Sequence, residues 1–326
     1  MFIDIGVLSL LATLFVKIIF LYIKGSDYLF DIKNIYQPAN LGEVLHMASL
    51  HPEAVIIAGG TDVLIQVREG KLAYRELLSI HGLTELQGIT KNEKGDLLIG
   101  PLSHFNDLEQ NPLIQLYIPI LAQAAATVGG PQIRAMGTLG GNIANGVTSA
   151  DTASSLYALE AEVLLQRAGG QRLLPIKEFY LGPAKTVLEQ GELLTKIIIR
   201  HANYVNTGGC YLKYAMREAM DIATLGCALL IRPDQAGQTI VQIRIAFGVA
   251  APVPMRAEAA EAALSGLPIE EAQERIASLV RAEINPRDSW RASREFRLHI
   301  AGVLAERALD QAWRQALERR PLPCSE

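Results

Sequence analysis

The chain has 326 residues, of which 50% are hydrophobic and 20% charged, which is enough to bury the cores of two domains. Its formal net charge of −4 argues against a nucleic-acid partner. The three cysteines, Cys210, Cys227 and Cys324, are scattered along the chain. They exclude a four-thiolate iron–sulfur site and indicate a reducing compartment, which we take to be the cytoplasm.

Residues 1–29 form an apolar N-terminal extension. The run from 6 to 23 is long enough to cross a bilayer, but Lys17 lies inside it, and a charge is costly at membrane depth. Asp4 and the lack of a small-residue cleavage site argue against a signal peptide. Two interpretations remain open: a membrane anchor, or a start codon assigned too early, with translation beginning at Leu29. Membrane contact is expected only through this extension.

Residues 30–204 have the pattern of an α/β domain. Asn40, with Glu43 three residues later, predicts the capped start of an amphipathic helix. Residues 55–57, 97–99, 162–166 and 193–199 are predicted to be strands. Residues 119–128 are predicted to be a helix that ends at two glycines, and Ser103 is predicted to cap another helix.

A polar, glycine-containing break at 201–209 marks the domain boundary, which we place between 204 and 205. The second domain, 205–318, is predicted to have strands at 211–216, 223–231 and 240–247. Helices are expected at 257–264, 270–282 and 290–317, and residues 319–326 form a tail. The last helix is expected to bury a stripe made of Phe296, Ile300, Val303, Leu304 and Ala308.

Two glycine-rich segments, 58–62 and 137–142, carry most of the functional information. Glycine permits a positive φ and close approach of a ligand, and successive backbone N–H groups form a nest for an anion. Two nests in one domain predict a pyrophosphate held from both sides, and therefore a dinucleotide. Asp62 would repel phosphate, so we expect its side chain to point away and cap the next turn.

Asp151 lies nine residues after Asn142 and is expected to accept a hydrogen bond from a ribose hydroxyl. The alternative is that Asp151 caps a helix beginning near Ser154. The sequence lacks GxGxxG and P-loop patterns, and its histidines are dispersed. A phosphate site without a catalytic acid, base or nucleophile indicates that a bound cofactor supplies the chemistry.

Four motifs, in order, resemble those of the FAD-binding subunits of molybdenum hydroxylases of the xanthine dehydrogenase type. They are segments 58–62, 137–142, 149–151, and 213–217 together with 221–223. The resemblance covers nearly everything beyond the N-terminal extension. It implies an α+β fold: a vanillyl-alcohol-oxidase (PCMH)-type FAD-binding domain, then a small C-terminal domain with a three-stranded sheet covered by helices.

The resemblance also implies the residues that bind FAD, with no catalytic and no metal-binding residue on this chain. The adenine–pyrophosphate part is expected to contact Ile56, Ile57, Ala58, Gly59, Gly60, Thr61, Asp62 and Val63. The pyrophosphate is also expected to contact Thr138, Gly140, Gly141 and Asn142, and a ribose hydroxyl Asp151. Apolar contacts are expected from Val128, Val187 and Leu188, and a cation beside the flavin from Lys213. Without the resemblance, Lys213 would be interpreted as a solvated strand lysine.

The implied function is electron transfer in purine metabolism, within a heterotrimer. A partner subunit with a molybdenum cofactor oxidises the substrate, and electrons pass through two [2Fe–2S] clusters in another subunit and FAD in this chain to NAD. Three alternatives remain open. The chain could be the FAD subunit of an aldehyde, carbon monoxide or nicotinate hydroxylase, a flavin-free scaffold tethered to the membrane, or an independent FAD oxidase.

Overall fold

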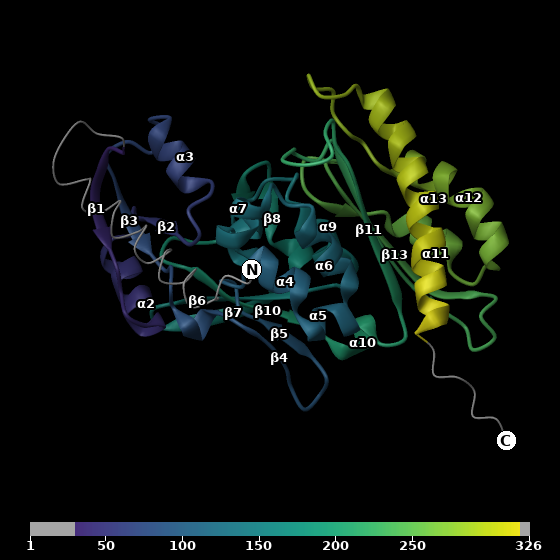
Figure 1. Cartoon of the computed structure of the whole chain (residues 1–326), viewed down its shortest axis with the longest axis horizontal. Coiled ribbons are helices and arrows are strands. Elements are labelled where there is room, and N and C mark those ends of the chain that lie inside the picture. Colours follow the sequence, from purple (N-terminus) through teal and green to yellow (C-terminus); the bar gives the residue numbers. More distant parts are fainter. Residues whose placement is uncertain (1–29, 320–326) are drawn as a thin grey trace, which may run out of the picture.

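The computed structural model describes residues 30–319, so the expectations for residues 1–29, for Cys324 and for nearly all of the tail lie outside the described residues. The described chain runs from a small parallel sheet, through a larger antiparallel sheet with its helices, to a C-terminal sheet covered by long helices (Figure 1). No helix between residues 30 and 319 has the length and hydropathy needed to cross a bilayer.

The first sheet is parallel and has the order β1 (Ile32–Tyr36), β3 (Arg75–Ser79), β2 (Val55–Ile57). Helix α2 (Leu41–Leu50) connects β1 to β2, and the Asn40 side chain accepts from the Glu43 amide, which confirms the predicted cap. The predicted strand at 55–57 is also confirmed. Strand β2 is parallel to its neighbour β3, so their carboxyl ends lie at the same end of the sheet. Residues 58–62 follow β2 there and lead into α3 (Val63–Arg68).

The second sheet is antiparallel and has the order β4 (Ile89–Lys91), β5 (Leu97–Ile99), β10 (Leu193–Ile199), β6 (Glu162–Arg167), β7 (Gly170–Pro175). A short ribbon of β8 (Tyr180–Gly182) and β9 (Lys185–Thr186) follows β7, and α10 (His201–Tyr204) follows β10. Single-turn helices Thr84–Leu86 and Ile176–Glu178 complete this region. The strands predicted at 97–99, 162–166 and 193–199 are all confirmed.

The chain between β5 and β6 is almost entirely helical. It contains α4 (Phe105–Gln110), α5 (Pro112–Tyr117), α6 (Pro119–Ala126), α7 (Pro131–Met136), α8 (Leu139–Ala144) and α9 (Asp151–Ala158). The prediction that Ser103 caps a helix is wrong by one residue: His104 is the N-cap of α4, and the Ser103 hydroxyl donates to the Gly88 carbonyl instead. Segment 137–142 is likewise the start of α8 and not an open loop.

The C-terminal sheet is antiparallel, with β11 (Gly208–Tyr214), β12 (Leu225–Pro233), β13 (Ile240–Gly248) and β14 (Met255–Arg256) in sequence order. The expected three strands are present, but the two-residue β14 adds a fourth that is too short to leave a sequence pattern. Figure 1 shows β11 and β13 between α6 and α9 on one side and the long C-terminal helices on the other. Both faces are therefore buried, which explains the continuous apolar runs in β12 and β13.

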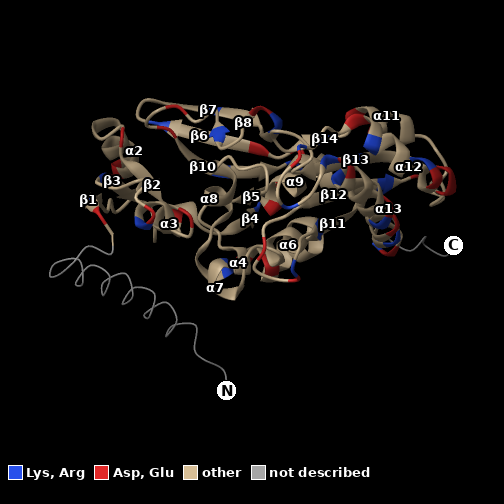
Figure 2. Ribbon diagram, turned by 90° about the horizontal axis from the view of Figure 1, so that it is seen from above, with Lys and Arg blue, Asp and Glu red and all other residues tan. Residues whose placement is uncertain are grey.

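The covering helices are α11 (Glu258–Leu264), α12 (Ile269–Glu283) and α13 (Arg294–Glu318), along which acidic and basic residues are interspersed (Figure 2). Helix α13 lies so close to β11 that a Cβ on Gly208 would be 2.0 Å from the Ala312 carbonyl oxygen. Only small residues permit this approach. The buried stripe of α13 is therefore rich in alanine, and the expectation that Phe296 belongs to it is wrong, since that side chain is 38% exposed beside Tyr214.

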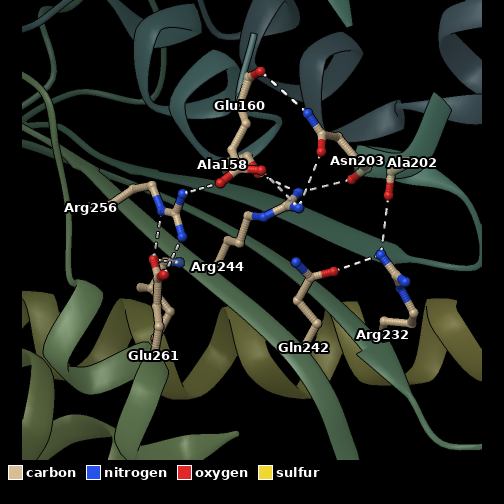
Figure 3. A network of polar contacts seen from close by, with 10 residues as sticks. Ala158, Glu160, Ala202, Asn203, Arg232, Gln242, Arg244, Arg256 and Glu261 are labelled. Carbon is tan, nitrogen blue, oxygen red and sulfur yellow. Dashed lines mark hydrogen bonds and ion pairs between the residues drawn. The ribbon is translucent and has the colours of Figure 1, made fainter. Parts of the chain in front are cut away.

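The carboxyl end of helix α9 is attached to the C-terminal sheet by the buried side chain of Arg244 (Figure 3). The guanidinium of Arg244, on β13, donates to the carbonyls of Ala158 and Asn203 at 3.3 and 2.9 Å. It also pairs with Glu160 at 2.9 Å, and Arg256 joins Glu160 to Glu261 on α11. A cation at this end of a helix faces unsatisfied carbonyls and the negative end of the helix dipole.

The turn between β4 and β5 is tied to the end of β10 through Asp96. Its carboxylate accepts from the His201 amide at 3.0 Å and from Arg200 at 3.1 Å. The His201 amide, together with Arg200 and Asn92, holds the pKa of Asp96 below its usual value against the opposing effect of burial. A carboxylate with a lowered folded-state pKa stabilises the fold above its unfolded pKa, and this stabilisation is lost as the pH falls through the folded pKa.

We expect Asp96→Asn to lower the free energy of unfolding by about 2 kcal/mol at pH 7, because hydrogen bonds to a charged acceptor are lost. The difference from the parent chain should shrink as the pH falls below about 4, where the unfolded carboxyl group is protonated. Guanidinium denaturation at pH 7 and pH 3 measures both values. A difference that is the same at the two pH values would contradict the assigned role of Asp96.

Candidate functional site

The two glycine-rich segments meet in space, although they lie far apart in the sequence. A Cβ on Gly59 would fall 1.7 Å from the Met136 carbonyl oxygen and 3.2 Å from the Gly137 nitrogen. Gly137 itself packs against the Phe105 ring, where a Cβ would lie 2.7 Å from a ring carbon. Gly59 is therefore required so that the first segment can pack on the second, and Gly137 so that the second can pack on α4. The two segments meet at the carboxyl end of β2 in the parallel sheet.

The first segment keeps its hydrogen-bond donors available. Gly60 has a φ of +74°, and between residues 30 and 319 the amides of Gly59, Gly60 and Thr61 find no acceptor. The Thr61 hydroxyl is also without a partner in the described part of the chain. Because backbone amides that no carbonyl satisfies attract anions, this turn has the chemistry of the predicted phosphate nest.

Asp62 is exposed, and it does not cap the next turn, contrary to expectation. It occupies the N-cap position of α3 without a side-chain hydrogen bond to that helix. Its carboxylate instead accepts from the Asn145 side-chain amide at 2.8 Å. This bond links the first segment to the end of α8 and keeps the negative charge of Asp62 turned toward a donor.

The second segment differs from the prediction, because most of its amides are already used. Gly140 donates to the Pro101 carbonyl, and Gly141 donates to the Thr138 hydroxyl, which caps α8. A Cβ on Gly140 would lie 2.4 Å from Pro101, so that glycine is required for packing. The Asn142 side-chain oxygen accepts from Thr152 at 2.6 Å, which leaves its NH₂ group as the donor that this segment offers.

Asp151 and Lys213 form a buried ion pair that joins α9 to β11. The Lys213 ammonium lies 2.9 Å from one Asp151 carboxylate oxygen, and the two side chains are 9% and 8% exposed. The ammonium also donates to the Thr127 carbonyl, next to Val128. The interpretation of Asp151 as a helix cap is wrong, because Ala150 is the N-cap of α9, and Lys213 is not a solvated strand lysine.

Tyr211 is a site residue that sequence reasoning missed. Its hydroxyl donates to the second Asp151 oxygen at 2.7 Å, and its side chain is buried. Burial raises the pKa of Asp151, while Lys213 and Tyr211 act in the opposite direction. Burial and the neighbouring carboxylate raise the pKa of Tyr211 well above its usual value, so the hydroxyl remains a donor. Tyr211 precedes Lys213 by two residues in a strand, and this spacing could have identified it.

The three apolar residues of the predicted set lie near this core. Val128 is buried in the apolar core around α6 and α9, and Val187 and Leu188, which follow β9, pack against the same core. The backbone of Val187 bonds to Phe179 and Arg172, and that of Leu188 to Thr186. Neither residue shares a hydrogen bond with the two glycine-rich segments or with the Asp151–Lys213 pair in the described part of the chain.

Taken together, among the described residues the unpaired amides and hydroxyl of 59–61 and the side-chain NH₂ of Asn142 lie on two segments that meet, and the buried Lys213 ammonium lies at the start of α9. The donor set fits a phosphate-containing ligand, and the exposed Gly141, where a Cβ would meet only the Thr138 hydroxyl oxygen, leaves room for it. The residues present therefore fit FAD, whose pyrophosphate can accept from these neutral donors and whose reduced flavin carries a negative charge that an ammonium can compensate.

Comparison with known proteins assigns the family. Residues 30–201 match the family model described as the FAD binding domain in molybdopterin dehydrogenase. Residues 210–312 match the CO dehydrogenase flavoprotein C-terminal domain. This chain belongs to the FAD-binding subunits of the molybdenum hydroxylases. The resemblance found in the sequence is thereby confirmed, as is the expected order of a PCMH-type FAD-binding domain and a C-terminal domain.

Individual relatives agree with this family assignment. The chain is 39% identical to the xanthine dehydrogenase FAD-binding subunit of Escherichia coli, over 87% of this chain and 97% of that protein. It is 33% identical to the carbon monoxide dehydrogenase medium chain of Hydrogenophaga pseudoflava, over 85% of this chain and 96% of that protein. A solved carbon monoxide dehydrogenase from the same organism superposes with a TM-score of 0.82 at 32% identity, covering 88% of this chain and 99% of that one.

We expect Gly59→Ala to destabilise the protein by about 1–3 kcal/mol, because its methyl group would overlap the Met136 carbonyl and force the two glycine-rich segments apart. Gly170→Ala is the matched control, since a Cβ there meets no atom within 4 Å. Urea denaturation of both variants gives the comparison. Equal stability of Gly59→Ala and Gly170→Ala would show that the two segments do not touch.

Proposed function

We propose that this chain is the FAD-carrying electron-transfer subunit of a xanthine dehydrogenase-type molybdenum hydroxylase, with NAD as the final acceptor. The partners would be a molybdenum-cofactor subunit and a [2Fe–2S] subunit, as the sequence resemblance implies. The relative of xanthine dehydrogenase type supports this choice through its 39% identity over nearly its whole length. Bound FAD would supply the exchange between single-electron donors and a hydride acceptor.

The observation that carries the proposal is the contact between the segment 58–62, whose amides at 59–61 are unsatisfied, and the segment 137–142, which carries the Asn142 side-chain amide. We propose that these groups hold the pyrophosphate of FAD, with Ile56 and Ile57 beside the adenine half. Neutral donors orient a phosphate without the desolvation cost of a buried lysine. The bond from Asn145 to Asp62 keeps the one nearby carboxylate directed toward a donor.

At the flavin end, we propose that Lys213 lies beside the ring and that Val128, Val187 and Leu188 exclude water from it. A fixed ammonium in a site of low dielectric constant favours the reduced, negatively charged flavin. Asp151 remains our candidate for a ribose hydroxyl. Each of its oxygens has one donor in this structure and a further lone pair with which to accept another.

We further propose that the two domains are 30–204 and 205–318. The change of core supports this division: the helices between β5 and β6 pack around one apolar cluster, whereas α11–α13 and one face of β11–β13 enclose another. The buried pair Asp151–Lys213 and the pair of exposed Glu160 with buried Arg244 would then hold the domains together.

We expect NADH to reduce FAD bound to the purified chain under anaerobic conditions, since hydride transfer between the two cofactors is reversible. One hydride from one NADH would convert one FAD to its anionic two-electron-reduced form and release one NAD⁺. Loss of the flavin absorption bands during titration with NADH measures this stoichiometry. Flavin that stays oxidised with NADH but is reduced by dithionite would show that the acceptor is not NAD.

A further inference from the structure

The ring of Tyr211 fills space in the apolar core, and phenylalanine could fill the same space. The hydroxyl group is therefore not needed for packing. The side chain is 5% exposed and its ring belongs to the apolar core shared by α6, α9 and the C-terminal sheet. Across the sheet, Lys213 pairs with Gly226, and a Cβ on Gly226 would lie 3.0 Å from the Tyr211 hydroxyl oxygen. The neighbouring strand therefore leaves space for this oxygen.

The Asp151 carboxylate accepts hydrogen bonds from two donors, and the Tyr211 hydroxyl is one of them. Tyr211 donates to one oxygen at 2.7 Å, and Lys213 donates to the other at 2.9 Å. The ammonium makes its further bond to the Thr127 carbonyl at 3.0 Å. A buried carboxylate keeps its charge only when its oxygens accept hydrogen bonds. The negative charge of Asp151, which positions the Lys213 ammonium and compensates its charge, therefore depends on Tyr211.

We propose that Tyr211 is a positioning residue whose hydroxyl keeps Asp151 ionised and directed at Lys213, and thereby sets how much of the Lys213 charge acts on the flavin. This inference rests on the proposed function, in which FAD binds here with Lys213 beside its ring. Tyr211 acts through the ion pair and needs no contact with the cofactor. It contributes to the reduction potential of FAD and not to the hydride step itself.

The sign of the effect follows from the charges. Without the hydroxyl, one Asp151 oxygen loses the donor that the described residues supply to it, so the carboxyl group is protonated more readily. Asp151 then compensates less of the positive charge of Lys213 than it does in the parent chain. Reduction of FAD by two electrons and one proton leaves a negative charge on the flavin, which the less compensated ammonium stabilises. Loss of the hydroxyl should therefore raise the midpoint potential.

Tyr211→Phe in the full chain tests the proposal, with Tyr157→Phe as the matched control. Tyr157 is also a buried tyrosine, on α9, and its hydroxyl has no partner in the part of the chain that the structure describes. FAD per chain is measured first, and the midpoint potential is then measured against a reference dye. At a fixed potential, the ratio of reduced to oxidised FAD should rise about tenfold in Tyr211→Phe, which equals about 30 mV for a two-electron couple. Tyr157→Phe should match the parent chain.

If Tyr211→Phe does not fold, a second variant tests the same proposal. Incorporation of 3-fluorotyrosine at position 211 keeps the shape of the ring and makes the hydroxyl a stronger donor to Asp151, so the midpoint potential should fall. A purely structural role for Tyr211 would not produce these opposite shifts.

The outcomes separate the inference from the function on which it rests. A parent chain that takes up no FAD would refute the proposed function. A parent chain with full FAD, together with a Tyr211→Phe variant of unchanged potential, would overturn the role of Tyr211 alone. Where that variant does not fold, an unchanged potential in the fluorotyrosine protein would overturn it in the same way.

Discussion

The buried ion pair between Asp151 and Lys213 is the interaction on which the rest of the site depends. It joins the first residue of α9 to β11, while Arg244 holds the other end of the same helix. Removing one member of such a pair leaves an uncompensated charge and costs about 3–5 kcal/mol, although the intact pair contributes little net stability. The pair therefore specifies one arrangement of the two elements. If α9 rotated or slid against the C-terminal sheet, the Lys213 contact at its first residue and the Arg244 contacts at its other end would both break.

The glycine-rich segments impose the second constraint, and their glycines serve two different purposes. Gly59, Gly137 and Gly140 permit contact between protein segments, because a Cβ on any of them would overlap backbone or side-chain atoms. Gly60 has a positive φ, which turns the chain so that consecutive amides remain unsatisfied. Close packing thus brings two distant segments together, and the local backbone conformation makes one of them a binding surface for an anion.

The sequence was sufficient where the signal was local. The Asn40 cap, the strand at 55–57 and the strand at 193–199 depend on neighbouring residues, and all three are confirmed. It was insufficient where distant contacts decide the structure. Two glycines disfavour a helix at 139–144, yet packing on Pro101 and the Thr138 cap make that segment α8. Lys213 looked solvated because its partner lies 62 residues away, and Tyr211 gained its role only through the same residue.

If the two converging glycine-rich segments and the Lys213 pair form one FAD site, the purified protein carries flavin. Its visible absorption spectrum shows this, with the released cofactor identified by chromatography. We expect flavin bands and FAD close to one per chain. A folded, colourless protein that takes up no added FAD would contradict it and would favour a scaffold role within the family.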